Sequence, residues 1–145
     1  MSHSYKYDFY ILLEKSTRSI LQKIICAGVK DMTKVKICGL SRPEDIEAVN
    51  TYGADYAGFV FFEKSKRNIS YEKSEMLLKE LKKNPNIQSV AVCVSPSKDE
   101  VKRMQNLGFD LIQIHGTIPA DCQSDGGLAL WQAVNIAGST EVDAD

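Results

Sequence analysis

Short apolar runs alternate with amphipathic stretches along the chain from residue 35 onward. The apolar runs have the length and composition of buried strands, and they lie at 35–38, 56–62, 90–94, 111–115 and 128–134. The stretches between them carry apolar residues at helical spacing. Strands joined by helices run parallel with right-handed crossovers, so the pattern predicts an α/β fold.

Two of the predicted helices share one starting signal. Ser41 and Glu44, with a proline between them, have the pattern of a capping box, and Ser97 and Glu100 repeat that pattern before a later helix. The repeated signal predicts that these helices begin near residues 42 and 98.

A Gly-X-Asp turn follows both of these helices, at 53–55 and at 108–110, and each time it leads into a strand. This recurrence indicates a repeated strand–helix unit. Between the two copies we expect a helix over about 71–83, and its apolar side carries Met76, Leu77, Leu78 and Leu81.

The spacing of the strands bears on the choice between an open sheet and a barrel. One unit takes (128 − 35)/4, or about 23 residues, so an eight-unit barrel would end at about residue 220. The sequence has 145 residues. A barrel would therefore hold about five of its eight units and be cut after the fifth strand. A complete open sheet is the alternative, but it needs a helix over that strand, and residues 141–145 are too few for one.

The first 31 residues fit neither pattern and form a separate N-terminal extension, followed by a domain over 32–145. We favour Met32 as the natural start, because a first strand follows directly and barrels commonly begin there; the extension is then upstream translation or a fusion remnant. The alternative is a docking helix, whose apolar face consists of Phe9, Leu12, Leu13, Ile20, Leu21, Ile24 and Ile25.

Composition and charge narrow the class of protein. With 43% hydrophobic and 26% charged residues the chain can bury a core, which argues against a disordered or fibrous protein. Its 18 basic and 19 acidic side chains nearly cancel, so we expect no nucleic-acid partner. The pattern contains neither a membrane span nor a secretory signal, so we expect no membrane partner and a cytoplasmic location. The four cysteines, at 26, 38, 93 and 122, lack the close spacing of metal or redox pairs, so we expect free thiols and no metal.

Polar residues stand at the ends of several predicted strands, where parallel α/β proteins gather their reactive groups. Cys38 ends the first strand on the face of Lys36, and His115 ends the fourth on the face of Gln113. A strand-end thiol near a cation can ionise and act as a base or nucleophile. The plainer interpretations are a packed thiol and a structural histidine, and Cys93, in mid-strand, is interpreted as core.

Three cations follow the second predicted strand, namely Lys64, Lys66 and Arg67. A solvated loop is the ordinary interpretation of such a run. If the site binds an anionic substrate, Arg67 is the candidate, because its planar guanidinium can hold a carboxylate through two hydrogen bonds.

Five segments together resemble one enzyme family. They are KICGLSRPED at 36–45, GAD at 53–55, GFVF at 58–61, KSKR at 64–67 and QIHG at 113–116. In order and spacing they closely resemble the phosphoribosylanthranilate isomerases, over about residues 32–145. The resemblance implies a TIM (βα)8 barrel and the Amadori rearrangement of a phosphorylated small molecule in tryptophan biosynthesis, without a cofactor.

The resemblance also implies roles for individual residues. Cys38 matches the family's cysteine base, which takes a proton from a sugar carbon. Arg67 matches an arginine near the anthranilate carboxylate, and His115 matches a histidine that borders the site. We expect Cys38 to be catalytic and the other two to bind substrate.

The same resemblance puts the family's general acid, an aspartate, at the end of a sixth strand, and its phosphate loops after the seventh and eighth. Asp110 stands at a strand start, and Asp121 and Asp125 lie in a weakly matching region, so none is nominated instead. We therefore expect an isomerase shortened at its C-terminus and inactive alone. The alternative is a non-catalytic partial barrel whose open edges pair with another chain, which implies self-association.

Overall fold

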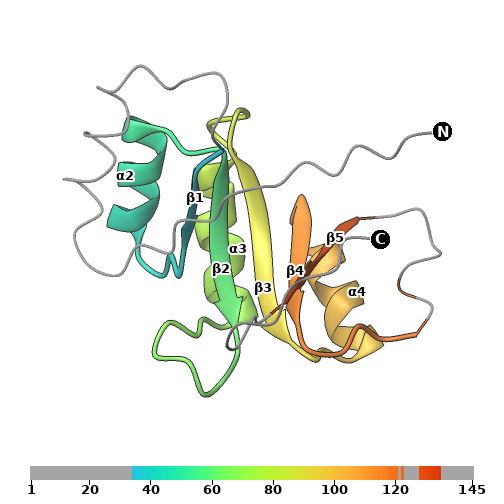
Figure 1. Cartoon of the computed structure of the whole chain (residues 1–145). Helices are drawn as coiled ribbons and strands as arrows, with labels where there is room; N and C mark the ends of the chain where they lie inside the picture. Colours follow the sequence, from blue (N-terminus) through green and yellow to red (C-terminus); the bar gives the residue numbers. More distant parts are fainter. Residues whose placement is uncertain (1–33, 121, 123–127, 135–145) are drawn as a thin grey trace, which may run out of the picture.

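The computed structural model describes residues 34–120, 122 and 128–134 of the chain (Figure 1). Its elements are β1 (Lys36–Cys38), α2 (Pro43–Tyr52), β2 (Tyr56–Phe61), α3 (Tyr71–Leu81), β3 (Gln88–Val94), α4 (Lys98–Asn106), β4 (Leu111–His115) and β5 (Ala129–Ala133). The expected extension over 1–31 lies outside the described residues. Among the helices of the described part, none has the length and apolar character needed to cross a membrane.

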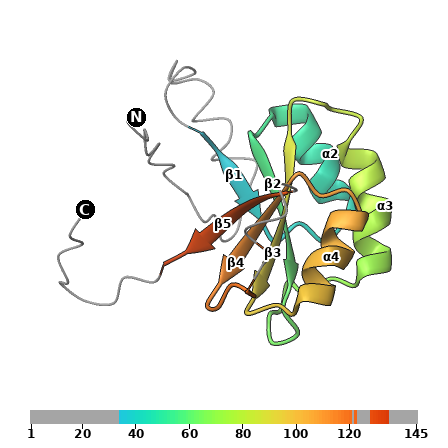
Figure 2. The same cartoon turned by 90° about the vertical axis from the view of Figure 1, so that its right-hand side faces the viewer.

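The strands form one parallel sheet, in which each strand lies beside its neighbours in the sequence. The order is β1-β2-β3-β4-β5. Helices α2, α3 and α4 all cover the same face of this sheet (Figure 2). An open doubly wound sheet would reverse its strand order and carry helices on both faces. The prediction of an α/β fold that is part of a barrel is therefore confirmed, and β1 and β5 are the edges of the described sheet.

The sheet separates two apolar layers. The larger lies between the sheet and the helices and includes Phe59 and Phe109, whose rings meet edge to face with centroids 5.6 Å apart. The smaller lies on the opposite, inner face and consists of Val90, Val92 and Leu111, with Cys38, Tyr56, Val60 and Trp131 packed against them. Because side chains alternate along a strand, Gln113 and His115 share the inner face with Leu111.

The repeated Gly-X-Asp turn has the same structural role in both copies. Each aspartate accepts a backbone N–H from the start of the preceding strand and pairs with a lysine. The partners are Val35 N (2.8 Å) and Lys34 Nζ (2.7 Å) for Asp55, and Ser89 N (2.7 Å) and Lys82 Nζ (2.9 Å) for Asp110. These contacts fix the register of the strands at their amino ends. They do not involve the carboxyl ends, where the candidate residues lie.

Helix α2 begins differently from the prediction. The expected capping box of Ser41 and Glu44 is wrong, because the helix begins at Pro43 with Arg42 as its N-cap. With proline as the first helical residue, the third is Asp45, and its carboxylate accepts the N–H groups of Ser41 and Arg42 at 3.0 Å each. The capping carboxylate is therefore one residue later than the sequence pattern indicated.

Helix α4 begins as predicted. The N–H of Ser97 donates to a carboxylate oxygen of Glu100 at 2.7 Å, and the N–H of Glu100 donates to the hydroxyl of Ser97 at 3.3 Å. Gly108 follows the helix with φ of 85° and lets the chain turn into β4. The predicted capping box is confirmed.

Helix α3 buries three of the four apolar residues expected on its inner side. Leu77, Leu78 and Leu81 are buried, whereas Met76 is 63% exposed. Three consecutive residues span about 200° of a helix, so one end of the run must face solvent. The placement of Met76 on the buried side was wrong for this reason.

Candidate active site

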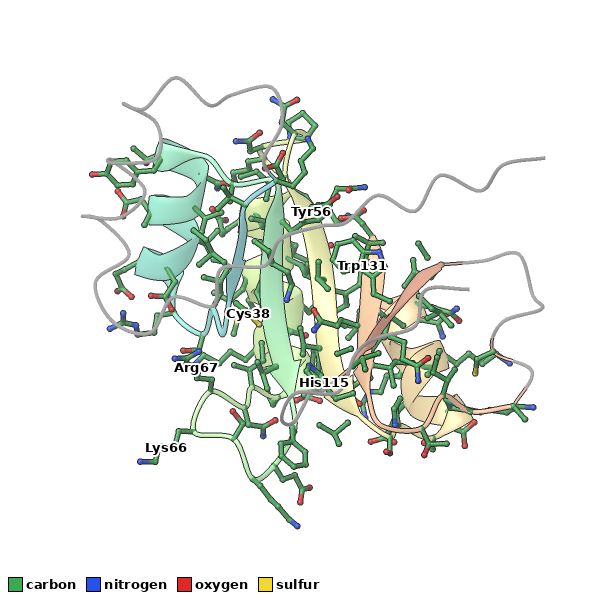
Figure 3. All side chains as sticks on the ribbon, in the orientation of Figure 1. Cys38, Tyr56, Lys66, Arg67, His115 and Trp131 are labelled. Atoms are coloured by element: carbon green, nitrogen blue, oxygen red, sulfur yellow. The ribbon has the colours of Figure 1, made fainter. Side chains whose placement is uncertain are left out.

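The carboxyl ends of the strands gather the residues that the sequence indicated. Cys38 ends β1 and His115 ends β4, while Arg67 lies in the loop after β2. Because the strands are parallel, their carboxyl ends all lie at the same end of the sheet. Figure 3 shows Cys38, Arg67 and His115 toward this end of the sheet and Tyr56, at the start of β2, away from it. The three residues thus share one end of the fold.

Cys38 is fixed by the neighbouring strand. It lies opposite Gly58 of β2, whose carbonyl oxygen accepts the N–H groups of both Gly39 (3.0 Å) and Leu40 (3.1 Å). The side chain of Cys38 is partly exposed and packs against the inner layer, not among the helices. The thiol therefore has a defined backbone position and an open side.

Cys93 shows what a packed thiol looks like in the same sheet. It is 2% exposed, faces the helices, and its Sγ lies 3.7 Å from the backbone oxygen of Gln113. Burial raises the pKa of Cys93 to about 12, so this thiol stays protonated. The interpretation of Cys93 as core is confirmed.

The loop between β2 and α3 folds back on itself and carries Arg67 toward β1. The N–H of Phe62 donates to the side-chain oxygen of Asn68 at 2.8 Å, and the N–H of Arg67 donates to the hydroxyl of Ser65 at 3.1 Å. The aliphatic stem of Arg67 then lies against the backbone of Gly39, the residue that follows the thiol. The loop thus places the guanidinium-bearing side chain beside the end of β1.

The other two cations of this loop do not share that position. Lys64 and Lys66 are exposed, and Figure 3 shows Lys66 directed away from the sheet, whereas Arg67 is partly buried. Of the three cations, Arg67 alone is partly buried, and it is also the one that guanidinium geometry favoured.

His115 is a neutral hydrogen-bonding group. The amide nitrogen Nε2 of Gln113 lies 3.1 Å from Nε2 of the imidazole and donates to it. Burial lowers the pKa of His115, and the positive charge of Lys36 lowers it further. A histidine with a lowered pKa is uncharged near neutral pH, so it can accept or donate without repelling a cation.

The sequence placed Lys36 and Gln113 on the strand faces of Cys38 and His115 but assigned neither of them a role. Lys36 is only 6% exposed, which is rare for lysine, and the amide oxygen of Gln113 is buried without a hydrogen-bond partner among the described residues. Each is a polar residue two positions before a strand-end candidate, on an inward face that is otherwise apolar. The alternation noted in the sequence pointed to their face, but their burial and contacts appear only in the structure.

Ser95 connects the ends of β3 and β4. It has a positive φ of 43°, its N–H donates to the backbone oxygen of His115 at 2.8 Å, and its hydroxyl accepts the N–H of Thr117 at 3.1 Å. A Cβ on Gly116 would lie 2.5 Å from that hydroxyl, so the glycine makes room for it. The backbone that leaves His115 is therefore held by the neighbouring strand end, at the cost of local strain at Ser95.

Together these groups suit proton transfer on an anionic small molecule. A positioned thiol takes a proton from carbon once it is ionised, a guanidinium binds a carboxylate, and a neutral imidazole exchanges hydrogen bonds with polar groups. Within residues 34–120, 122 and 128–134, no group of three or more metal-binding side chains occurs. Asp110 lies at the amino end of β4, at the opposite end of the sheet from Cys38 and His115.

Comparison with known sequences identifies the family. The sequence profile of N-(5'phosphoribosyl)anthranilate (PRA) isomerase matches residues 35–144. The N-(5'-phosphoribosyl)anthranilate isomerase of Streptococcus mutans is 43% identical over 111 residues, which are 76% of this chain and 56% of that relative. An isomerase of Streptococcus pneumoniae is 42% identical over 112 residues, which are 77% of this chain and 55% of that relative. The chain thus spans about half the length of the curated relatives it matches.

Solved structures agree with the sequences. Monomers of the dimeric phosphoribosylanthranilate isomerase of Thermotoga maritima match with a TM-score of 0.65 at 33% identity, over 73% of this chain and 54% of theirs. The enzyme of Thermus thermophilus matches with a TM-score of 0.66 at 27% identity, over 75% and 55%. An isomerase in complex with reduced 1-(o-carboxyphenylamino)-1-deoxyribulose 5-phosphate matches with a TM-score of 0.64 at 32% identity, over 73% and 55%. By its sequence and by its five-stranded partial barrel, this chain belongs to the phosphoribosylanthranilate isomerase family.

Proposed function

We propose that this chain supplies the N-terminal part of a phosphoribosylanthranilate isomerase active site. The reaction converts N-(5-phosphoribosyl)anthranilate into 1-(2-carboxyphenylamino)-1-deoxyribulose 5-phosphate, a step of tryptophan biosynthesis. The observation that carries the proposal is the partly exposed thiol of Cys38 at the carboxyl end of β1, next to the glycine over which Arg67 lies.

Cys38 is the base in this proposal. Once the ribose ring has opened to a protonated Schiff base, the thiolate takes the proton from the neighbouring sugar carbon. The C–H electron pair forms the carbon–carbon double bond of an enolamine, and the electron pair of the C=N double bond moves onto nitrogen. Tautomerisation of the enolamine then gives the ketone product. Carbon acids are weak, so the base must be held close to its proton, which fits a fixed thiol with an open side.

Arg67 and His115 bind the substrate. The guanidinium of Arg67 pairs with the anthranilate carboxylate, for which its planar fork is suited. The complex of the solved relative contains a carboxyphenyl group and a phosphate in one ligand, which supports an anionic, phosphorylated substrate for this chain. His115, held neutral, borders the sugar as a hydrogen-bonding group.

The resemblance assigns the general acid and the phosphate loops to later strands than the five of the described sheet. We infer that the 145-residue chain alone lacks isomerase activity, because proton removal without ring opening gives no product. The chain and the remaining half of a barrel then form one site between them.

A chimera tests this function. Residues 34–134 replace the matching segment of the Streptococcus mutans isomerase, and rearrangement of phosphoribosylanthranilate is followed by chromatography of the product. We expect activity in the chimera and none in the 145-residue chain. A chimera that folds cooperatively but forms no product would contradict the proposal, and full activity of the 145-residue chain would contradict the division of the site.

Self-association through the edges β1 and β5 is a second candidate, supported by their position at the two ends of the described sheet. Light scattering on the purified chain distinguishes the candidates: a defined dimer without isomerase activity supports a pairing module, and a monomer excludes it. The cytoplasmic location expected from the sequence stays a prediction, which cell fractionation can test.

A further inference from the structure

We propose that Gly58 is a positioning residue for Cys38, because its bare α-carbon leaves the space in which the thiol lies. The catalytic meaning of this inference rests on the proposed function. Its geometric content does not, because the position of the thiol can be measured without substrate.

The backbones of the two residues are joined directly. Cys38 and Gly58 are register partners in the parallel pairing of β1 with β2. The carbonyl oxygen of Gly58 accepts the N–H groups of both residues after the thiol, Gly39 at 3.0 Å and Leu40 at 3.1 Å. Gly58 therefore fixes the direction in which the chain leaves Cys38.

The missing side chain of Gly58 matters as much as its carbonyl. A Cβ at this position would lie 2.8 Å from Sγ of Cys38, 3.1 Å from its Cα and 3.2 Å from its Cβ. Contacts this short are rarely tolerated, and rotation of the thiol relieves only the first of them. A methyl group at residue 58 would thus move both the sulfur and the strand that carries it.

The neighbours of Gly58 on the inner face are large. Tyr56 and Val60 lie two residues before and after it on β2, and both belong to the apolar layer against which Cys38 packs. Gly58 is therefore a gap between two bulky side chains, and the sulfur lies at that gap. We call this space the Gly58 slot.

Alkylation of Cys38 in the 145-residue chain tests the proposal. The second-order rate with iodoacetamide is measured from neutral to alkaline pH, and peptide-resolved mass spectrometry separates the four cysteines. In Gly58→Ala the new methyl displaces the sulfur and covers one side of it, so we expect Cys38 to react about fivefold more slowly, with a changed pH profile. Cys122 should react at its parental rate.

Leu77→Ala is the matched control for loss of stability, because Leu77 is buried in the helix layer on the other face. It should lower the melting temperature and leave the rate at Cys38 within about twofold of the parent. A Gly58→Ala chain whose Cys38 reacts with the parental rate and pH profile would overturn the proposal.

A double-mutant cycle covers the case in which Gly58→Ala folds poorly. Cys38→Ala removes the sulfur, which is the atom nearest to the added methyl. We expect Gly58→Ala to lower the melting temperature less in the Cys38→Ala background than in the parent, since contacting residues are coupled. Equal losses in both backgrounds would also overturn the proposal. Neither measurement uses isomerase activity, so its outcome is separate from that of the chimera.

Discussion

The aliphatic stem of Arg67 lies directly over the α-carbon of Gly39. A Cβ at residue 39 would be 3.2 Å from Nε of Arg67 and 3.3 Å from its Cγ, and nearer still to its Cδ. Residue 39 also has φ of 88°, which favours glycine. The arginine of one loop is therefore placed beside the thiol of another strand because a single residue has no side chain.

Gly39→Ala should weaken substrate binding more than it weakens the fold. In the active chimera we expect KM to rise about tenfold with a smaller change in kcat, because the displaced guanidinium no longer meets the carboxylate. Gly108→Ala is the matched control, since Gly108 has φ of 85° but its Cβ would meet nothing within 4 Å. Steady-state kinetics of both variants check this, and equal KM values would contradict the role given to Arg67.

Lys36→Met should raise the pKa of His115. Burial is the main cause of the lowered pKa and the charge of Lys36 is the second, so removal of the charge should recover part of the shift and leave His115 below its usual 6.5. An NMR titration of the imidazole protons measures this. An unchanged pKa would mean that the lysine does not act on His115.

The same lowered pKa predicts how stability depends on pH. As the pH falls through about 6.5, the imidazole of the unfolded chain binds a proton before that of the folded chain does, so the folded state loses stability down to its own lower pKa. Replacing His115 by Gln should flatten this part of the profile. Urea unfolding at a series of pH values gives the measurement, and a parental profile in the variant would count against the assignment.

Asp45→Ala should destabilise the fold by about 1 kcal/mol, because the N–H groups of Ser41 and Arg42 lose their acceptor. Glu44→Ala is the control, since both acids lie in the first turn of α2 but only Asp45 caps it. Its effect should stay within about 0.5 kcal/mol. Urea unfolding of the two variants compares them, and the reverse order would restore the capping box expected from the sequence.

Asp110→Asn should remove the stabilisation that the ionised carboxylate of Asp110 gives to the fold, which is lost in acid. Partial burial raises the pKa of Asp110, but hydrogen bonds from Ser89 and the charge of Lys82 outweigh it, so the net pKa lies below the usual 3.8. The stabilisation is present above about pH 3.8 and is lost as the pH falls toward the folded pKa. The free energy of unfolding of the parent should therefore decrease as the pH falls below about 3.8, and that of Asp110→Asn should decrease less over the same range. Acid unfolding of the two proteins compares these losses, and equal losses would contradict the role given to Asp110.

The sequence predicted those features that arise from neighbours along the chain. The capping box of Ser97 and Glu100 was visible because it needs only four residues. The strand ends were equally visible, since apolar runs stop there. The cap at Asp45 was misplaced because Pro43 sets the first helical residue, which the spacing of Ser41 and Glu44 does not reveal.

Contacts between distant segments were beyond the reach of the pattern. Arg67 meets Gly39 only because the loop after β2 folds back on itself. The effect of Lys36 on His115 crosses the inner face from β1 to β4. Such relationships depend on sheet order and curvature, which set distances that no local spacing encodes.

The rate of the Cys38→Ser chimera tests the central claim most directly. Serine keeps the size of the side chain but has a hydroxyl that does not ionise at neutral pH, so kcat should fall at least about 100-fold. Affinity for the reduced product analogue should be unchanged, which shows that the site is intact. A serine chimera that keeps kcat within about threefold of its parent would contradict the assignment of Cys38 as the base.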